Sequence, residues 1–248
     1  MTSFFTLQFV LLTFAGVLIG VFSVVVGGGF FISIPFIQWL FPQVSVGAVV
    51  GNLKVGSFFR SIGSTLSTFK QIEFLQNLKI MPPALIGTVL GAMTISNIDQ
   101  RWLLPAIISA IIFTLQAPKW ASKVSNKGFA LAAFITGIYS GVLGAGIGIM
   151  LVALLRLKHP KDTEIIFVKI QARFVEFMLT TAAVLTHMIS GNLITALWIP
   201  LAIGGVIGGY VGGEVLNKFG QLSGRTQKNI LYSAFAVDLM VASKKFFE

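Results

Sequence analysis

Charged and amide side chains stand inside two long apolar stretches of this sequence. The first stretch, 44–68, contains Asn52, Lys54 and Arg60, and the second, 164–189, contains Lys169, Gln171, Arg173 and Glu176. Burying a charge in a bilayer costs several kcal/mol, so charged residues in such stretches usually have a function. The surplus of cations suits an anion, because a guanidinium such as that of Arg173 can donate two parallel hydrogen bonds to an oxyanion. We therefore predict that these residues line the path of a small anion.

Helical spacing places Lys169, Arg173 and Glu176 on one face, with Arg173 and Glu176 three residues apart and able to pair. A buried carboxylate beside the site can lose its charge during transport, so Glu176 is the candidate for the proton-linked group. The alternatives are a purely structural pair of Arg173 with Glu176, and Lys169 or Arg60 side chains that extend to the membrane surface. His187, near the end of the same stretch, is predicted to be a solvated interfacial histidine.

Two glycine clusters stand in the middle of the apolar runs 4–41 and 128–157. One consists of Gly27, Gly28 and Gly29, and the other includes Gly144, Gly146 and Gly148. A single helical crossing needs about 20 residues, so each run is predicted to form two helical arms that fold about its cluster. The N-terminal end of a half-helix exposes backbone N–H groups that suit an anion, although close helix packing is the alternative. For the glycine run 204–213, in an unbroken segment, packing is the favoured explanation.

The composition predicts an all-α, polytopic membrane protein. Of 248 residues, 55% are apolar and 10% are charged, whereas about a quarter are charged in a soluble domain. Apolar runs occupy 4–41, 44–68, 78–97, 102–117, 128–157, 164–189, 192–217 and 229–243. The absence of cysteine excludes disulfides and thiol chemistry, and two histidines are too few for a histidine-rich metal cluster. We therefore expect no catalytic site, metal or cofactor. Most Lys and Arg residues lie in short breaks between apolar runs, which argues against nucleic acid as a partner.

The sequence also contains an internal duplication. One set of glycines recurs at an offset of 121 residues: Gly16, Gly20 and Gly27 correspond to Gly137, Gly141 and Gly148. A second set recurs at an offset of 117 residues: Pro83, Gly87 and Gly91 correspond to Pro200, Gly204 and Gly208. The two halves, 1–124 and 125–248, are each predicted to be a folded segment followed by three spans. At the first offset, Asn52 and Arg173 occupy the same repeat position.

The distribution of lysine and arginine predicts the orientation of these halves. If both broken segments return to the side they entered from, eleven basic residues in the loops share one face and three lie on the other. If each broken segment crosses once, the split is seven against seven. Because basic residues favour the cytoplasmic side, we predict the first arrangement, with both termini outside and the halves inverted. Inverted repeats with discontinuous helices are a recurrent architecture of secondary transporters.

The glycine-rich segments resemble those of the sulfite exporter TauE/SafE family. Residues 27–35 read Gly-Gly-Gly-Phe-Phe-Ile-Ser-Ile-Pro, residues 41–52 form a proline-containing loop and the start of a helix dotted with polar residues, and the glycine module recurs at 141–148. The resemblance implies export or import of sulfite, sulfonates or related sulfur anions, coupled to a proton or sodium gradient.

The sequence thus predicts a secondary transporter of a small, sulfur-containing anion in the cytoplasmic membrane. Its expected partners are the lipid bilayer and a coupling proton or sodium ion, and a homodimer is a possible assembly. The anion site is expected near mid-membrane between the glycine breaks, with Asn52, Lys54, Gln171 and Arg173 joining the glycine N–H groups. A small-anion channel, a membrane scaffold or assembly protein, and an intramembrane enzyme are the alternatives.

Overall fold

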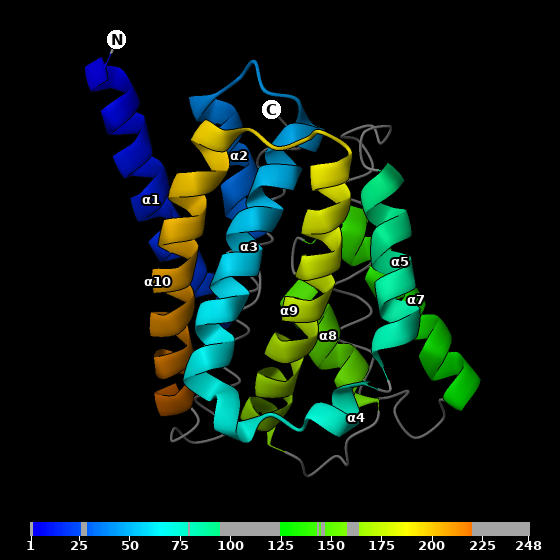
Figure 1. Ribbon diagram of the computed structural model, residues 1–248. Coiled ribbons are helices and arrows are strands. Elements are labelled where there is room, and N and C mark those ends of the chain that lie inside the picture. Colours follow the sequence, from blue (N-terminus) through cyan, green and yellow to red (C-terminus); the bar gives the residue numbers. More distant parts are fainter. Residues whose placement is uncertain are drawn as a thin grey trace, which may run out of the picture.

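The computed structural model describes residues 2–25, 29–78, 80–94, 125–142, 144, 147–157 and 164–219, and within these ranges the chain is helical with no strand. The helices form a bundle with two ends (Figure 1). The upper end carries the connections 41–45 and 190–194, and the lower end carries residues 69–73 and the start of α9. An all-α fold is therefore confirmed for the described part of the chain.

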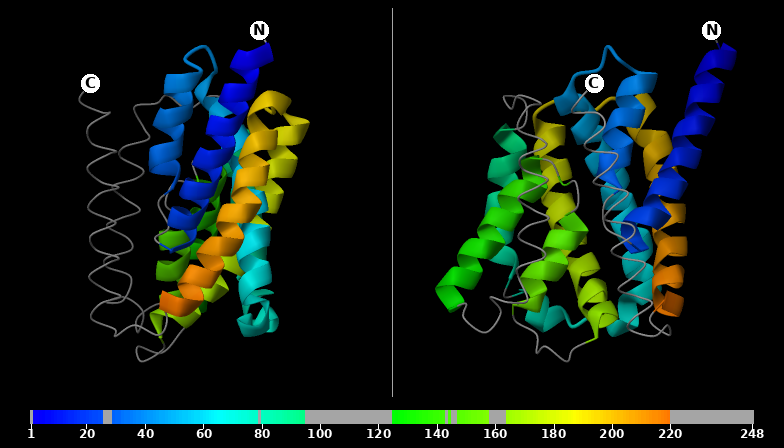
Figure 2. Two further views of the ribbon diagram at one scale, coloured as in Figure 1. Left: turned by 90° about the vertical axis from the view of Figure 1, so that its left-hand side faces the viewer. Right: turned by 180° about the vertical axis from the view of Figure 1, so that it is seen from behind.

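Both long apolar runs with a glycine cluster divide into two helices. Helix α1 (Thr2–Val25) runs down from the upper end, and α2 (Phe30–Leu40) returns to it (Figures 1 and 2). Helix α7 (Asn126–Val142) and α8 (Ile147–Arg156) do the same from the lower end. The second break contains Gly144 with φ of +63°, a conformation that residues with a Cβ rarely adopt. In the first break, residues 26–28 lie outside the described residues.

Two antiparallel helices, α3 (Val46–Thr68) and α9 (Ile165–Ile189), contact each other at the centre of the bundle. Ser45 caps α3, since its hydroxyl accepts a hydrogen bond from the Ala48 N–H at 3.3 Å. Helix α10 (Thr195–Phe219) packs on α3 and α1, and α5 (Met81–Thr94) packs on α9 and α7. At the lower end, a 3₁₀ turn (Phe69–Gln71) and α4 (Phe74–Leu78) connect α3 to α5. The described helices thus form two similar groups around the central pair.

Glycines allow the helices within each group to pack with their backbones close together. A Cβ on Gly204 would lie 2.2 Å from the Thr13 carbonyl oxygen of α1, and one on Gly208 would lie 2.3 Å from that of Val17. In the other group, a Cβ on Gly141 would lie 2.1 Å from the Thr88 carbonyl oxygen of α5. The packing role predicted for the glycine run of α10 is therefore confirmed, and it allows the backbones to approach as they do at small-residue contacts in membranes.

Gly209→Ala should destabilise the fold because the added Cβ would lie 2.0 Å from the Arg60 carbonyl oxygen of α3. Overpacking of this kind costs about 1–3 kcal/mol, and thermal unfolding in detergent would measure it. Gly56→Ala is the matched control, since its Cβ would meet the Leu201 side chain at 3.2 Å, and we expect a smaller loss. Equal stability of the two variants would contradict close α3–α10 packing.

The outer surface of the bundle is apolar. Large exposed apolar side chains include Leu7, Phe14 and Leu18 of α1, Ile86 and Leu90 of α5, Leu131 and Ile135 of α7, and Ile203, Ile207 and Val211 of α10. Among the described helices, α1 over Leu7–Val25 and α10 over Thr195–Lys218 are long and apolar enough to cross a membrane. The interior, in contrast, holds buried charges (Lys54, Arg60, Lys169, Arg173 and Glu176). Such an inside-out distribution of polarity suits a lipid environment.

Candidate functional site

An ion cluster joins the two central helices. Glu176 of α9 accepts hydrogen bonds from Arg60 of α3 through Oε1 and from Arg173 Nη1 through Oε2, the second at 2.5 Å. Arg173 also donates through Nη2 to the Val24 carbonyl oxygen near the end of α1, at 2.8 Å, while its buried Nε has no partner among the described residues. All three residues are at most 5% exposed. Arg60, Arg173 and Glu176 are named here the central cluster.

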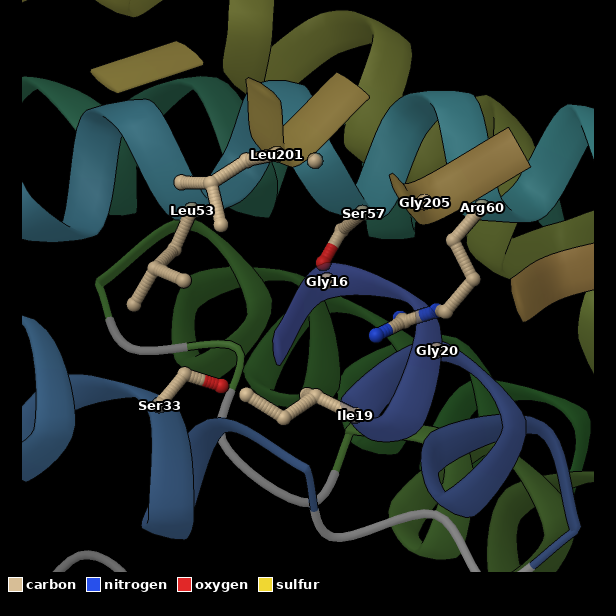
Figure 3. Close-up of a pocket in the computed structure, with 10 residues that line it drawn as sticks. Gly16, Ile19, Gly20, Ser33, Leu53, Ser57, Arg60, Leu201 and Gly205 are labelled. Carbon is tan, nitrogen blue, oxygen red and sulfur yellow. The ribbon is translucent and has the colours of Figure 1, made fainter. Parts of the chain in front are cut away.

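A small cavity of about 30 Å³ opens beside this cluster, between α1, α2, α3 and α10 (Figure 3). The Arg60 guanidinium and the hydroxyl groups of Ser33 and Ser57 point into it. Ser33 donates to the Gly29 carbonyl oxygen at 2.5 Å, whereas the Ser57 hydroxyl has no partner within the ranges that the structure describes. One water molecule needs about 10–15 Å³ of such a cavity. The cavity therefore has room for about two water molecules, or a group of that size, beside the Arg60 cation.

Two buried lysines stabilise the ends of the broken helices. Lys54 of α3 donates from Nζ to the Ser140 carbonyl oxygen near the end of α7, and Lys169 of α9 donates to the Val25 carbonyl oxygen at the end of α1. The C-terminal end of a helix carries partial negative charge and free carbonyl groups, which a cation stabilises. Gly144 makes room for this contact, because a Cβ there would lie 2.0 Å from Lys54 Nζ.

These contacts correct the expectation that Lys169 and Arg60 could extend to the membrane surface. Lys169 is 3% exposed and Arg60 is 5% exposed, and both bond within the bundle. His187 is also not a solvated interfacial residue: it is fully buried, and neither ring nitrogen has a hydrogen-bond partner in the described part of the chain. Its ring lies beside Gly51 of α3, whose Cβ would be 3.5 Å from it. Packing against neighbouring helices buries all three side chains, and the periodicity of a single helix does not indicate this packing.

The glycine clusters lie close to the cationic residues. A Cβ on Gly148, in the first turn of α8, would lie 3.0 Å from Arg173 Nη2. Gly29 precedes α2, and a Cβ there would lie 1.8 Å from the Ser23 hydroxyl of α1. The structure therefore brings Gly148 to the central cluster and Gly144 to Lys54. The predicted site residues Gly27, Gly28 and Gly146 lie outside the described residues.

Asn52 and Gln171 are not part of the central cluster. At the upper end, Asn52 Nδ2 donates to the Asn192 carbonyl oxygen at 3.3 Å, and its Oδ1 accepts from the Ile194 N–H at 2.9 Å. At the lower end, Gln171 accepts from the Glu73 N–H at 2.8 Å and the Asn77 side chain at 2.9 Å, and donates to the Gln71 carbonyl oxygen at 2.7 Å. Asn52 thus connects α3 to the loop that follows α9, and Gln171 connects α9 to the loop that follows α3.

Asn52→Ala should lower stability without weakening anion binding, because it leaves loop groups of residues 192–194 without their partner. Removing one partner of a buried hydrogen bond costs about 1–3 kcal/mol, and thermal unfolding would show this loss. Titration with sulfite should give an affinity close to that of the native protein. A variant of normal stability that no longer binds sulfite would instead place Asn52 in the anion site.

The sequence singled out Arg173 and Glu176 together and placed Arg60 on the anion path without naming it as a ligand, whereas Ser57 and Ser33 were missed as members of the site. Arg60 stood in an apolar stretch, and this signal marked it as unusual without identifying its partner. The serines gave no signal, since serine is common in membrane helices and usually bonds to its own backbone.

A helical bundle with an apolar exterior, broken helices and a buried, cation-rich centre is typical of membrane transporters. Comparison with protein families identifies the class more closely: the sequence profile of the family described as sulfite exporter TauE/SafE matches residues 12–239. The chain belongs to this family, whose members are integral membrane transporters of sulfur-containing anions. Comparison with curated proteins and with solved structures gave no match.

Proposed function

We propose that this protein is a secondary transporter that carries sulfite, an organosulfonate or a related sulfur oxyanion across the cytoplasmic membrane, and that the anion binds at the central cluster. The observation that supports this most strongly is the charge of the buried interior. The described buried side chains include four basic groups (Lys54, Arg60, Lys169 and Arg173) and one carboxylate, Glu176, a formal surplus of three positive charges. An uncompensated buried charge is strongly destabilising, so an anion in this region offsets an existing cost.

Arg60 is the residue we expect to meet the anion first, because its guanidinium points into the cavity (Figure 3). The hydroxyls of Ser57 and Ser33 stand on the same cavity and can donate hydrogen bonds to a second or third oxygen. A planar guanidinium matches two oxygens of an oxyanion at once. The cavity in this state is small, so we expect binding to accompany a separation of the helices that line it.

Glu176 is the proposed coupling group. Its carboxylate holds both arginines of the central cluster, and an incoming oxyanion competes with it for Arg60. Protonation removes the negative charge of Glu176 and thereby favours replacement of the carboxylate by the anion. One proton and one anion then bind together and move together. A sodium gradient is the alternative source of energy.

We also propose that the halves 1–124 and 125–248 are inverted repeats with both termini outside. Three features of the described residues support this arrangement: α1 and α2 fold back from the upper end, α7 and α8 fold back from the lower end, and α3 and α9 run antiparallel. The 3₁₀ turn, the start of α7 and the ends of α8 and α10 lie at the lower end and carry the basic residues Lys70, Lys127, Arg156 and Lys218. This favours a cytoplasmic location for that end. Alternating access would come from movement of the halves about the central cluster.

Uptake of sulfite into proteoliposomes tests the proposed function. A carrier predicts saturable uptake that an imposed proton or sodium gradient accelerates. A small-anion channel would give flux that does not saturate and needs no second gradient, and a scaffold protein would give none. Absence of uptake with sulfite, thiosulfate and simple sulfonates would contradict the proposal.

A further inference from the structure

Three hydroxyl groups of α3 have no hydrogen-bond partner among the residues that the structure describes. These are the buried side-chain oxygens of Ser57, Ser61 and Thr65. On the same helix, Ser64 and Thr68 donate to backbone carbonyl oxygens one turn earlier, at 3.2 and 2.8 Å. A serine or threonine in a helix commonly satisfies its hydroxyl in this way, and buried polar groups without a partner are rare. The three hydroxyls are therefore available to water or to a ligand.

These hydroxyls follow one side of α3 from the cavity toward the lower end. They stand at intervals of four residues, which turns each one about 40° from the last and spaces the three over about 12 Å along the axis. Ser57 lines the cavity beside Arg60, and its hydroxyl points into it (Figure 3). Ser57 and Ser61 are only 3% and 1% exposed. An unpartnered polar row thus begins at the cavity and continues inside the bundle.

We propose that Ser57, Ser61 and Thr65 line a hydrated route by which the oxyanion passes between the central cluster and the lower end of the bundle. This inference rests on the proposed function and names the path that the anion takes from its site. Hydroxyl groups donate hydrogen bonds to an anion without holding it as tightly as a guanidinium does. Helix α3 carries no acidic residue, so none of its own side chains repels an anion along this route.

Cysteine substitution tests the route directly, because the native chain has no cysteine. The variants Ser57→Cys, Ser61→Cys and Thr65→Cys would be treated in membrane vesicles with iodoacetate, an anion, and with iodoacetamide, its neutral analogue. Ser67→Cys is the matched control, because Ser67 lies against Gly213 of α10 and its hydroxyl donates to the Ser64 carbonyl oxygen at 2.9 Å. Reaction with free cysteine gives the intrinsic ratio of the two rates.

We expect all three route variants to be modified, with an iodoacetate-to-iodoacetamide ratio about tenfold above that of Ser67→Cys, since a cationic site concentrates anions. After the reagent is removed, carboxymethylated Ser61→Cys should take up sulfite far more slowly than its untreated form, and Ser67→Cys should be unchanged. Unreactive Ser61→Cys and Thr65→Cys in a protein that transports sulfite would overturn the route and leave the function standing. Reactive, anion-selective cysteines in a protein that moves no sulfur anion would support the route and overturn the proposed substrate.

Discussion

Sulfite uptake should fall about a hundredfold when Arg60 is replaced by Gln. Among the described residues that line the cavity, Arg60 is the only charged one. A hydrogen bond to a charged group contributes about 1.5–3 kcal/mol, and loss of a bidentate contact therefore corresponds to about two factors of ten or more. Initial rates of uptake into proteoliposomes, at sulfite concentrations that define both KM and the maximal rate, would measure the effect.

Arg60→Lys is the matched control for this experiment. It keeps the positive charge beside Glu176 but loses the planar fork, so we expect a raised KM with a smaller loss of the maximal rate. Native-like uptake by a correctly folded Arg60→Gln protein would show that Arg60 is only a structural partner of Glu176. The binding site would then have to be sought elsewhere.

Glu176→Gln should destabilise the protein and uncouple it from the proton gradient. The substitution leaves the guanidinium groups of Arg60 and Arg173 without their shared carboxylate, and breaking a buried ion pair costs about 3–5 kcal/mol. Sulfite should restore part of this loss, because an anion that binds only the folded state stabilises it by mass action. We therefore expect the rise in melting temperature with added sulfite to be larger for the variant than for the native protein.

The same variant tests the coupling. With no carboxylate to protonate at position 176, uptake should lose its response to an imposed pH gradient while sulfite binding persists. Glu214→Gln is the control, since Glu214 is an exposed carboxylate on α10. Full proton-driven uptake by Glu176→Gln would exclude Glu176 as the coupling group. If Glu176→Gln instead loses only its response to an imposed sodium gradient, sodium would be the coupling ion.

Much of the fold could be predicted from the sequence because its determinants are local. The apolar runs predicted the helices, and the glycine clusters predicted where α1 ends before α2 and where α7 ends before α8. The pairing of Arg173 with Glu176 followed from their spacing of three residues on one helix. The packing role of the glycines in α10 followed from their density in an unbroken apolar segment.

The contacts between the two halves could not be predicted, because they depend on how distant helices pack. Arg60 and Glu176 are 116 residues apart in the sequence, and nothing local indicates that they meet. Lys54 and Lys169 were expected to face an anion, yet each donates to a carbonyl group near the end of a broken helix.

The partners of the polar residues at the ends of the central helices could not be predicted for the same reason. Asn52 and Gln171 looked like ligands because amide side chains are rare inside apolar stretches. Their partners are loop groups that lie 140 and 100 residues away, and only the antiparallel packing of α3 and α9 brings these loops within reach. The burial of His187 likewise depends on the approach of α3 at Gly51.

The most direct test of the account is the position of a bound anion. Selenite, the heavier analogue of sulfite, can be soaked into crystals of the protein and located by the anomalous scattering of selenium. We predict a peak in the cavity within hydrogen-bonding distance of the Arg60 guanidinium and the Ser57 hydroxyl. A selenite that binds reproducibly elsewhere, with Arg60 and Arg173 still paired with Glu176, would contradict the central cluster as the anion site.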